Sequence, residues 1–233
     1  MRRIINQELT AWVTNPARKP LLIRGARQVG KTYAATELGR QHFKSLVTVN
    51  FEKEPGYADC FKELDPQKII SQITQLSNQS IIAGKTLLLL DEIQECPNAI
   101  RALRYFKEEM PELHIIATGS LLEFTLNSAQ FSMPVGRVQS LYMYPVSFYE
   151  LLTALGHDKL CDYLATINIT DTIPDSIHNK LLSLLREYFV LGGMPEVIAN
   201  YSEHKDLHQV QLLHADILNT YRNDFGKYAP QAQ

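Results

Sequence analysis

The residue types most suited to chemistry lie together near the start of the chain. Residues 25–32 read Gly25-Ala26-Arg27-Gln28-Val29-Gly30-Lys31-Thr32. This is a full match to G-x-x-x-x-G-K-S/T, in which the glycines let the backbone curl so that successive N–H groups point at a phosphate. The lysine supplies charge for the β- and γ-phosphates, and the Thr32 hydroxyl is a ligand for Mg²⁺. We expect nucleotide contacts along this whole stretch and from Tyr33, which follows it.

An acidic pair follows the longest aliphatic run of the chain. Leu87 to Leu90 lead directly into Asp91 and Glu92. A carboxylate at the carboxyl end of a buried strand belongs where open α/β sheets bind ligands, so we expect Asp91 in the Mg²⁺ shell. Glu92 is the expected general base for the attacking water. The alternative is an acidic pair that only begins a loop, and the phosphate-binding pattern upstream favours the catalytic interpretation.

Two hydroxyl residues, Thr118 and Ser120, end a strand predicted over residues 113–117. A hydroxyl at this place can hydrogen-bond the attacking water or the γ-phosphate and so sense hydrolysis, and either residue fits that role. Ser120 also stands three residues before Glu123, the spacing of a capping box at the start of a helix.

Arg137 is the candidate for neutralising charge in the transition state. It follows Gly136 and an irregular stretch over residues 126–136, which we predict to be a mobile loop. An arginine placed there acts on the nucleotide of its own chain or on that of a neighbouring subunit. The alternative is an exposed arginine in a surface salt bridge.

The order of strands and helices predicts how these residues are held. Strands alternate with helices over the first two thirds of the chain, which implies βαβ units and an α/β fold with a doubly wound, mostly parallel sheet. The strand that leads to Thr118 is expected between those that lead to Lys31 and Asp91. A helix over residues 2–14 packs beside the base or covers an edge of the sheet. The predicted strands are 21–23, 46–51, 86–92, 113–117 and 140–144, and the following helices are 30–42, 66–76 and 98–109.

From Ser147 onward the apolar spacing predicts helices only. We therefore expect a nucleotide-binding domain over residues 1–156 and a helical domain over residues 157–233, truncated at its C-terminus, with a linker near residues 166–175. The predicted helices of this part are 147–155, 158–165, 176–190, 194–200 and 206–222.

Composition limits the remaining possibilities. The chain has 233 residues, of which 45% are hydrophobic and 21% charged, as in an ordinary globular protein. A net charge of -2 gives no electrostatic case for nucleic-acid binding by the whole chain, although a local basic patch is compatible with it. The three cysteines form no pattern for disulfides or metal, and the longest aliphatic run is far shorter than a membrane span. We expect a cytoplasmic protein without a membrane partner.

Taken together, these motifs resemble the AAA_14 family of bacterial and archaeal AAA-type ATPases, which are related to the STAND and archaeal ATPase groups. The resemblance implies a P-loop NTPase fold of the AAA/ASCE type with a helical segment behind it, and a C-terminal domain that this chain lacks. Ala26 departs from the family, where proline or serine is more usual. The residues that carry the resemblance are the phosphate-binding stretch, Leu90 to Gln94, Ala117 to Ser120, Gly136-Arg137, Tyr144-Pro145-Val146-Ser147-Phe148-Tyr149-Glu150-Leu151 and Gly192-Gly193-Met194-Pro195-Glu196-Val197.

Three functions fit these observations. The first is Mg²⁺-dependent ATP hydrolysis that drives or switches an unidentified protein partner or the missing domain, with a homo-oligomer as a possible assembly. The second is a switch or scaffold module that retains ATP or ADP with little turnover. The third is a DNA-stimulated ATPase, which is supported only by the groups to which the family is related.

Overall fold

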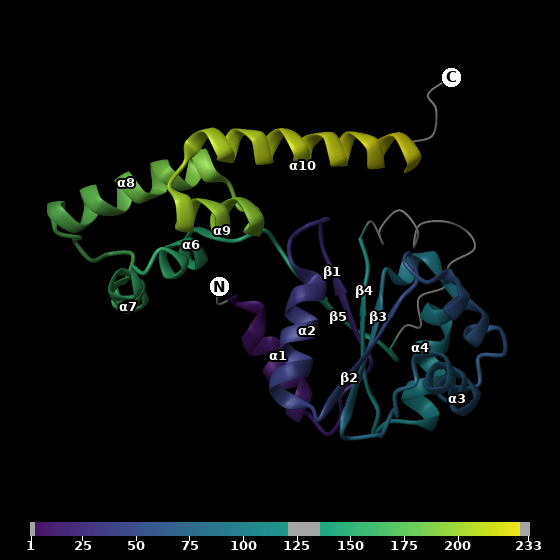
Figure 1. The fold of residues 1–233 in the computed structure, drawn as a ribbon. Coiled ribbons are helices and arrows are strands. Elements are labelled where there is room, and N and C mark those ends of the chain that lie inside the picture. The colour runs from purple at the N-terminus through teal and green to yellow at the C-terminus, as the bar shows by residue number, and fades with distance from the viewer. Residues whose placement is uncertain (1–2, 121–135, 229–233) are drawn as a thin grey trace. The chain divides into compact units, whose positions relative to one another are not determined.

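A computed structural model of the chain describes residues 3–120 and 136–228 (Figure 1). Glu123 and all but the last residue of the loop expected over residues 126–136 lie outside this description. The chain forms two compact units. One is Ile5–Met143, and the other is Tyr144–Gln233 together with Met1–Ile4.

The first unit is built on a parallel sheet of five strands within the described residues. The order is β2-β3-β4-β1-β5, and every neighbouring pair is parallel. This confirms the predicted doubly wound α/β fold and places β4 between β1 and β3. The strands are β1 (Leu21–Arg24), β2 (Ser45–Asn50), β3 (Thr86–Asp91), β4 (His114–Thr118) and β5 (Gln139–Tyr142).

Helices cover both faces of this sheet (Figure 1). Successive side chains of a strand point to opposite faces, so Leu87 and Leu89 join one apolar cluster while Leu88 and Leu90 join the other. Because both faces are buried, β3 reads as an unbroken apolar run. One cluster contains α1 (Ile5–Thr14) and α2 (Lys31–His42), and the other contains the 3₁₀ helix η1 (Pro55–Phe61), α3 (Pro66–Ser77) and α4 (Pro97–Glu109).

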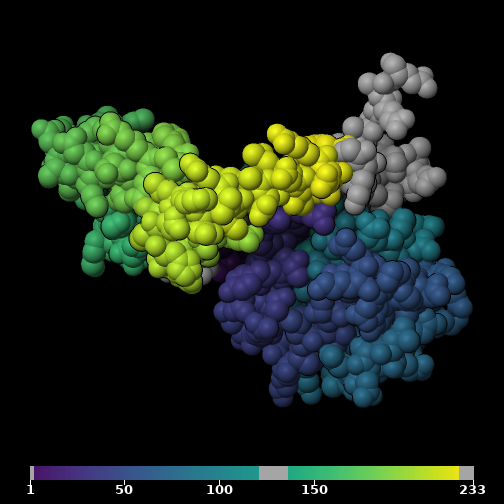
Figure 2. Space-filling model, turned by 45° about the horizontal axis from the view of Figure 1, so that its top comes forward, coloured from purple at the N-terminus to yellow at the C-terminus, as the bar shows by residue number. Residues whose placement is uncertain are grey.

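The segment between β2 and α3 contains more structure than its sequence indicated. A turn at residues 51–53 ends β2, and the chain then forms η1, which has a proline in its first turn. Its apolar residues Tyr57, Cys60 and Phe61 are buried in the core, whereas the charged side chains Asp59 of η1 and Lys68 of α3 are exposed. This part of the chain lies at the surface of the first unit (Figure 2, blue). The helix was missed because its apolar residues are too few to show a period.

Within its described residues the second unit is all helical, as expected, but it begins at Tyr144, earlier than expected. It contains α6, which packs with three later helices, so by its contacts this unit starts before the boundary predicted near residue 156. The chain crosses between the units at Met143–Tyr144 and also at Ile4–Ile5. None of the helices in the described ranges has the length and apolarity to cross a membrane. The helices are α6 (Phe148–Ala154), α7 (Asp158–Thr166), α8 (Asp175–Leu191), α9 (Pro195–His204) and α10 (Leu207–Tyr228).

Candidate nucleotide site

The phosphate-binding stretch connects the end of β1 to the start of α2. Gly25 and Gly30 have φ values of 137° and 96°, a region that side chains rarely adopt. A Cβ atom at Gly25 would also lie 2.1 Å from the carbonyl oxygen of Met143, so that position has no room for a side chain. The first N–H groups of α2 have no partner within the helix, and they add the positive end of the helix to the loop.

Lys31, the first residue of α2, is folded into this loop. Its side chain is buried, and Nζ donates hydrogen bonds to the carbonyl oxygens of Gly25 at 2.9 Å and Ala26 at 2.7 Å. The ammonium group is therefore kept beside the loop backbone. Phosphate oxygens carry negative charge and form stronger, charge-assisted hydrogen bonds with an ammonium group than neutral carbonyls do.

Asp91 is the centre of a hydrogen-bond cluster at the carboxyl ends of the strands. It is 5% exposed, and its Oδ1 accepts hydrogen bonds from the hydroxyls of Thr32, at 2.9 Å, and Thr118. Its Oδ2 accepts from the side-chain amide of Asn50 at 2.8 Å. The sheet order explains why Asn50 and Thr118 lie beside Asp91. Asn50 pairs with Asp91 in the strand register, and β4, which ends at Thr118, lies beside β3.

Glu92 has a separate set of partners. Its φ of 52° lies in the left-handed region, which is uncommon for a residue other than glycine. Its Oε2 accepts hydrogen bonds from Gln94 Nε2 at 2.7 Å, and from the hydroxyl and the backbone N–H of Ser120 at 3.2 and 3.4 Å. Of the two hydroxyl residues, Thr118 therefore donates to Asp91 and Ser120 donates to Glu92.

Two residues of this site, Asn50 and Gln94, were missed by the sequence analysis. The Asn50 amide reaches Asp91, and its Oδ1 accepts a hydrogen bond from the backbone N–H of Lys53 at 2.8 Å. The sequence did give a signal for Asn50, because it is a polar residue at the end of a predicted strand. Gln94 carried no comparable signal, because its contact depends on the turn that Glu92 makes.

The other residues predicted to contact the nucleotide differ in how exposed their side chains are. Val29 is buried, whereas Ala26, Gln28 and Tyr33 are exposed and Arg27 is half-buried. Gln28 has a positive φ of 65°, so the loop curls at a residue other than its glycines as well.

Arg137 does not lie at the site of its own chain. Gln139 pairs with Leu21 at the start of β1, so Arg137 stands at the amino edge of the sheet, opposite the phosphate-binding loop. Its Nε donates to Glu108 Oε1 at 2.9 Å, and half of the arginine side chain is exposed. Hydrogen bonds from Arg137 and then Arg104 lower the pKa of Glu108. The contact with Glu108 is a surface salt bridge, which was the alternative considered for Arg137.

The three cysteines are buried and have free thiols. Burial raises the pKa of Cys60 and of Cys96 and so disfavours the reactive thiolate. Within the described ranges, no group of three or more histidine, cysteine, aspartate or glutamate side chains is placed to hold a metal ion.

Comparison with known families decides the classification. The sequence model of the AAA domain family AAA_14 matches residues 17–152, which is more than half of the chain. The chain belongs to the AAA_14 family. A second match, over residues 182–233, is to a domain of unknown function (DUF8612). Membership of AAA_14 and the sheet topology together indicate a nucleotide-binding ATPase.

Solved structures similar to this AAA_14 chain include a Drosophila ORC bound to DNA, with a TM-score of 0.51 at 14% identity, covering 97% of this chain and 67% of the other. C. elegans PCH-2 has a TM-score of 0.47 at 14% identity, with 93% and 67% covered. Aeropyrum pernix ORC1 in complex with DNA has a TM-score of 0.46 at 15% identity, with 93% and 66% covered. The likeness to the Drosophila chain shows a shared fold. No curated protein matches the sequence.

Proposed function

We propose that this AAA_14 chain binds ATP with Mg²⁺ and hydrolyses the bond to the γ-phosphate. The observation that carries the proposal is the meeting of Thr32 and Asp91 at 2.9 Å beside a loop that holds the Lys31 ammonium group. A hydroxyl and an ammonium group from the first residues of α2 lie here with a carboxylate from the end of β3, at the edge of the sheet where such folds bind ligands.

The donor set fits Mg²⁺. This ion prefers oxygen ligands, keeps several waters, and is held by one or two protein groups together with substrate phosphates. Thr32 and Asp91 supply such oxygens, and Asn50 and Thr118 fix the orientation of the Asp91 carboxylate through their own hydrogen bonds. When bound, the ion supplies positive charge to the phosphate oxygens.

The chain's own residues account for the remaining steps. The loop amides and Lys31 bind the phosphates, with Lys31 exchanging its carbonyl partners for phosphate oxygens. Glu92 takes a proton from the water whose oxygen forms the new bond to the γ-phosphorus, while the bond to the bridging oxygen breaks and ADP leaves. Ser120 and Gln94 hold the Glu92 carboxylate, so they set where that proton is accepted.

A slow nucleotide switch is the second candidate function. It is favoured by the three hydrogen bonds that Glu92 accepts on one oxygen, because they hold the carboxylate in one position and resist any movement that it needs to reach the attacking water. An ATPase whose general base is restrained in this way hydrolyses ATP slowly and retains its nucleotide for a long time between turnovers. The contacts of the described residues give no comparable support to stimulation by DNA, and the experiment below tests it directly.

The deciding experiment compares the parent protein with Lys31→Ala. Calorimetry with Mg²⁺ and a non-hydrolysable ATP analogue should show at least about a hundredfold weaker binding in the variant, because charge-assisted hydrogen bonds to phosphate are lost. Turnover of ATP is then measured with and without duplex DNA. Repeated fast turnover supports the enzyme, and tight retention with slow release of phosphate supports the switch.

Lys62→Ala is the matched control for this experiment. Lys62 is exposed and pairs with Asp59 at the surface of the same unit, so its loss should leave the affinity for nucleotide unchanged. Unchanged affinity in Lys31→Ala would contradict the assignment of the nucleotide site.

A further inference from the structure

The side-chain amide of Gln94 has one bonded end and one end without a partner. Gln94 belongs to η2 (Ile93–Glu95), the short 3₁₀ helix that directly follows the acidic pair. Its Nε2 donates to Glu92 Oε2 at 2.7 Å, whereas its Oε1 is buried and accepts no hydrogen bond within the described part of the chain. A buried acceptor without a partner destabilises a fold, so its presence beside a candidate catalytic group points to a ligand atom.

The contact with Glu92 assigns the two ends of this amide. Rotating the group by half a turn would bring Gln94 Oε1 against Glu92 Oε2, where two acceptors repel each other. The left-handed turn at Glu92, with its φ of 52°, places the two side chains of this short segment together. Gln94 Oε1 and Nε2 are bonded to the same carbon, so the unused acceptor is fixed beside the Glu92 carboxylate.

The contacts of Glu92 also identify which of its oxygens takes the proton. Oε2 accepts from Gln94 Nε2 and from the hydroxyl and the backbone N–H of Ser120. A carboxylate oxygen has two lone pairs, so three donors use its full capacity. These contacts leave Oε1 of Glu92 as the oxygen that receives a proton from the attacking water.

The attacking water has two protons, and the general base takes only one of them. A second acceptor for the remaining O–H fixes the direction of the lone pair that attacks phosphorus, and such positioning accounts for a large share of catalysis. Ser120 already gives its hydroxyl proton to Glu92 and so holds the base. Gln94 Oε1 is an acceptor at the same carboxylate whose hydrogen-bonding capacity is unused.

We propose that Gln94 is a second residue that binds the attacking water. Glu92 Oε1 takes one proton while Gln94 Oε1 accepts a hydrogen bond from the other O–H. This inference rests on the proposed hydrolysis. The water oxygen forms the new bond to the γ-phosphorus, the bond to the bridging oxygen breaks with its electron pair remaining on ADP, and Glu92 holds the released proton. Gln94 exchanges no proton, so its amide is unchanged after each turnover.

Steady-state hydrolysis of ATP by the whole chain tests this role. Gln94→Leu removes both ends of the amide and should lower kcat about 10²-fold, because the water is no longer oriented. KM, and the calorimetric affinity for adenylyl imidodiphosphate with Mg²⁺, should stay within about twofold of the parent, since Gln94 contacts no phosphate. Gln67→Leu is the matched control, because it makes the same change at an exposed position in the first turn of α3 and should leave kcat unaltered.

Gln94→Lys separates binding of the water from holding of the base. Its ammonium group still donates to Glu92 Oε2 but accepts no hydrogen bond. The added charge changes the pH dependence of kcat, so each protein is compared at the pH where it is fastest. If Gln94 binds the water, this variant stays about 10²-fold below the parent at its best pH. If the amide only holds Glu92, the variant reaches the parental kcat.

Each outcome bears on a different part of the proposal. A parental kcat in Gln94→Leu, or in Gln94→Lys at its best pH, overturns the role of Gln94 and leaves the nucleotide site and Glu92 standing. Affinity for the analogue that falls more than about tenfold in Gln94→Leu also overturns it, because the residue is then structural. Binding without any turnover in the parent overturns both the proposed hydrolysis and this role. If Gln94→Leu does not fold, Gln94→Met replaces it, and the same criteria apply.

Discussion

At the scale of single residues, the adjacent carboxylates at the end of β3 differ in what holds them. Asp91 accepts hydrogen bonds from Thr32, Thr118 and Asn50, whereas Glu92 accepts from Ser120 and Gln94. None of these donor side chains is shared. A substitution at one carboxylate therefore leaves the supports of the other in place, and binding and hydrolysis become separable by mutation.

We expect Glu92→Gln to bind ATP as the parent does and to lower the turnover number by about 10²–10³, because an amide accepts hydrogen bonds but takes no proton. Phosphate release under saturating ATP measures the rate, and calorimetry measures the affinity. Glu95→Gln makes the same change at an exposed neighbour and should leave both values unaltered. A parental rate in Glu92→Gln would show that another group is the base.

At the scale of elements, the helical unit depends on a close backbone approach. Val146 and Gly193 are 47 positions apart in the sequence, yet the Val146 N–H donates a hydrogen bond to the Gly193 carbonyl oxygen at 2.7 Å. Tyr188 of α8 bonds to the same residue, so α6, α8 and α9 are joined at one place. Glycine is required at position 193 because the backbone and Pro145 occupy the space of a side chain.

Gly193→Ala should therefore lower the free energy of unfolding by about 1–3 kcal/mol, since the new methyl group forces the backbones apart. Urea unfolding followed by circular dichroism measures the change. Gly56→Ala is the control, because nothing lies within 4 Å of its Cβ position, and it should change stability by less than about 0.5 kcal/mol. Equal effects of the two variants would contradict the close approach at Gly193.

At the scale of the whole molecule, the direction of β5 decides what Arg137 can reach. The parallel register puts Arg137 about six residues, or roughly 20 Å at ~3.3 Å per residue, from the level of Gly25 along the strands. From this position Arg137 is too far along the strands to reach a nucleotide at the loop of its own chain, which leaves only the nucleotide of a neighbouring chain. We keep this role in trans as a proposal, with the Glu108 ion pair as its resting state.

If the proposal holds, specific activity rises with protein concentration, and Arg137→Ala binds ATP normally but hydrolyses it about 10³-fold more slowly, as expected when an arginine supplied in trans is lost. Mixing Arg137→Ala with Glu92→Gln then restores part of the activity, because a mixed interface pairs an intact Glu92 site with an intact arginine. Activity that is independent of concentration, with no rescue, would rule out a role in trans.

Several features were determined by the sequence alone because they depend on neighbours along the chain. Lys31 and Thr32 follow the glycines of a local motif, and Asp91 follows a run of leucines that marks a strand buried on both faces. The alternation of strands and helices was sufficient to predict the parallel sheet, and β4 does lie between β1 and β3.

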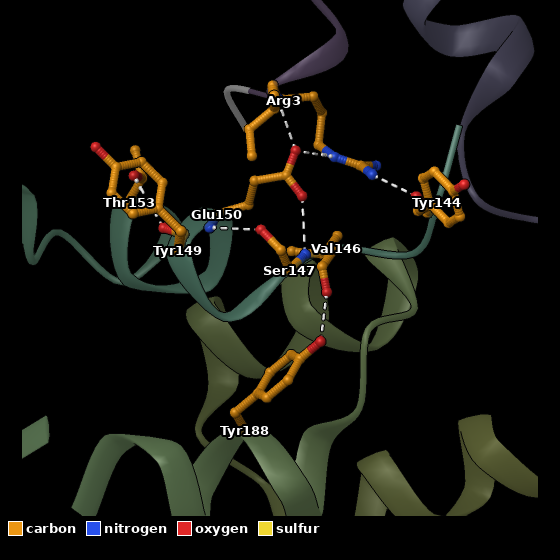
Figure 3. Close-up of polar contacts among 9 residues, drawn as sticks. Arg3, Tyr144, Val146, Ser147, Tyr149, Glu150, Thr153 and Tyr188 are labelled. Atoms are coloured by element: carbon orange, nitrogen blue, oxygen red, sulfur yellow. Dashed lines mark hydrogen bonds and ion pairs between the residues drawn. The ribbon is translucent and has the colours of Figure 1, made fainter. Parts of the chain in front are cut away.

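Only the tertiary structure decided the features that depend on residues far apart in the sequence. The contact of Asn50 with Asp91 needs the strand register, and the position of Arg137 needs the direction of β5. The boundary at Met143–Tyr144 depends on α6 packing against later helices, and a buried ion pair joins Arg3 to Glu150 across 147 positions (Figure 3). Local patterns of apolar residues predict where an element forms, but its partners are selected by packing between distant segments, which no single stretch encodes.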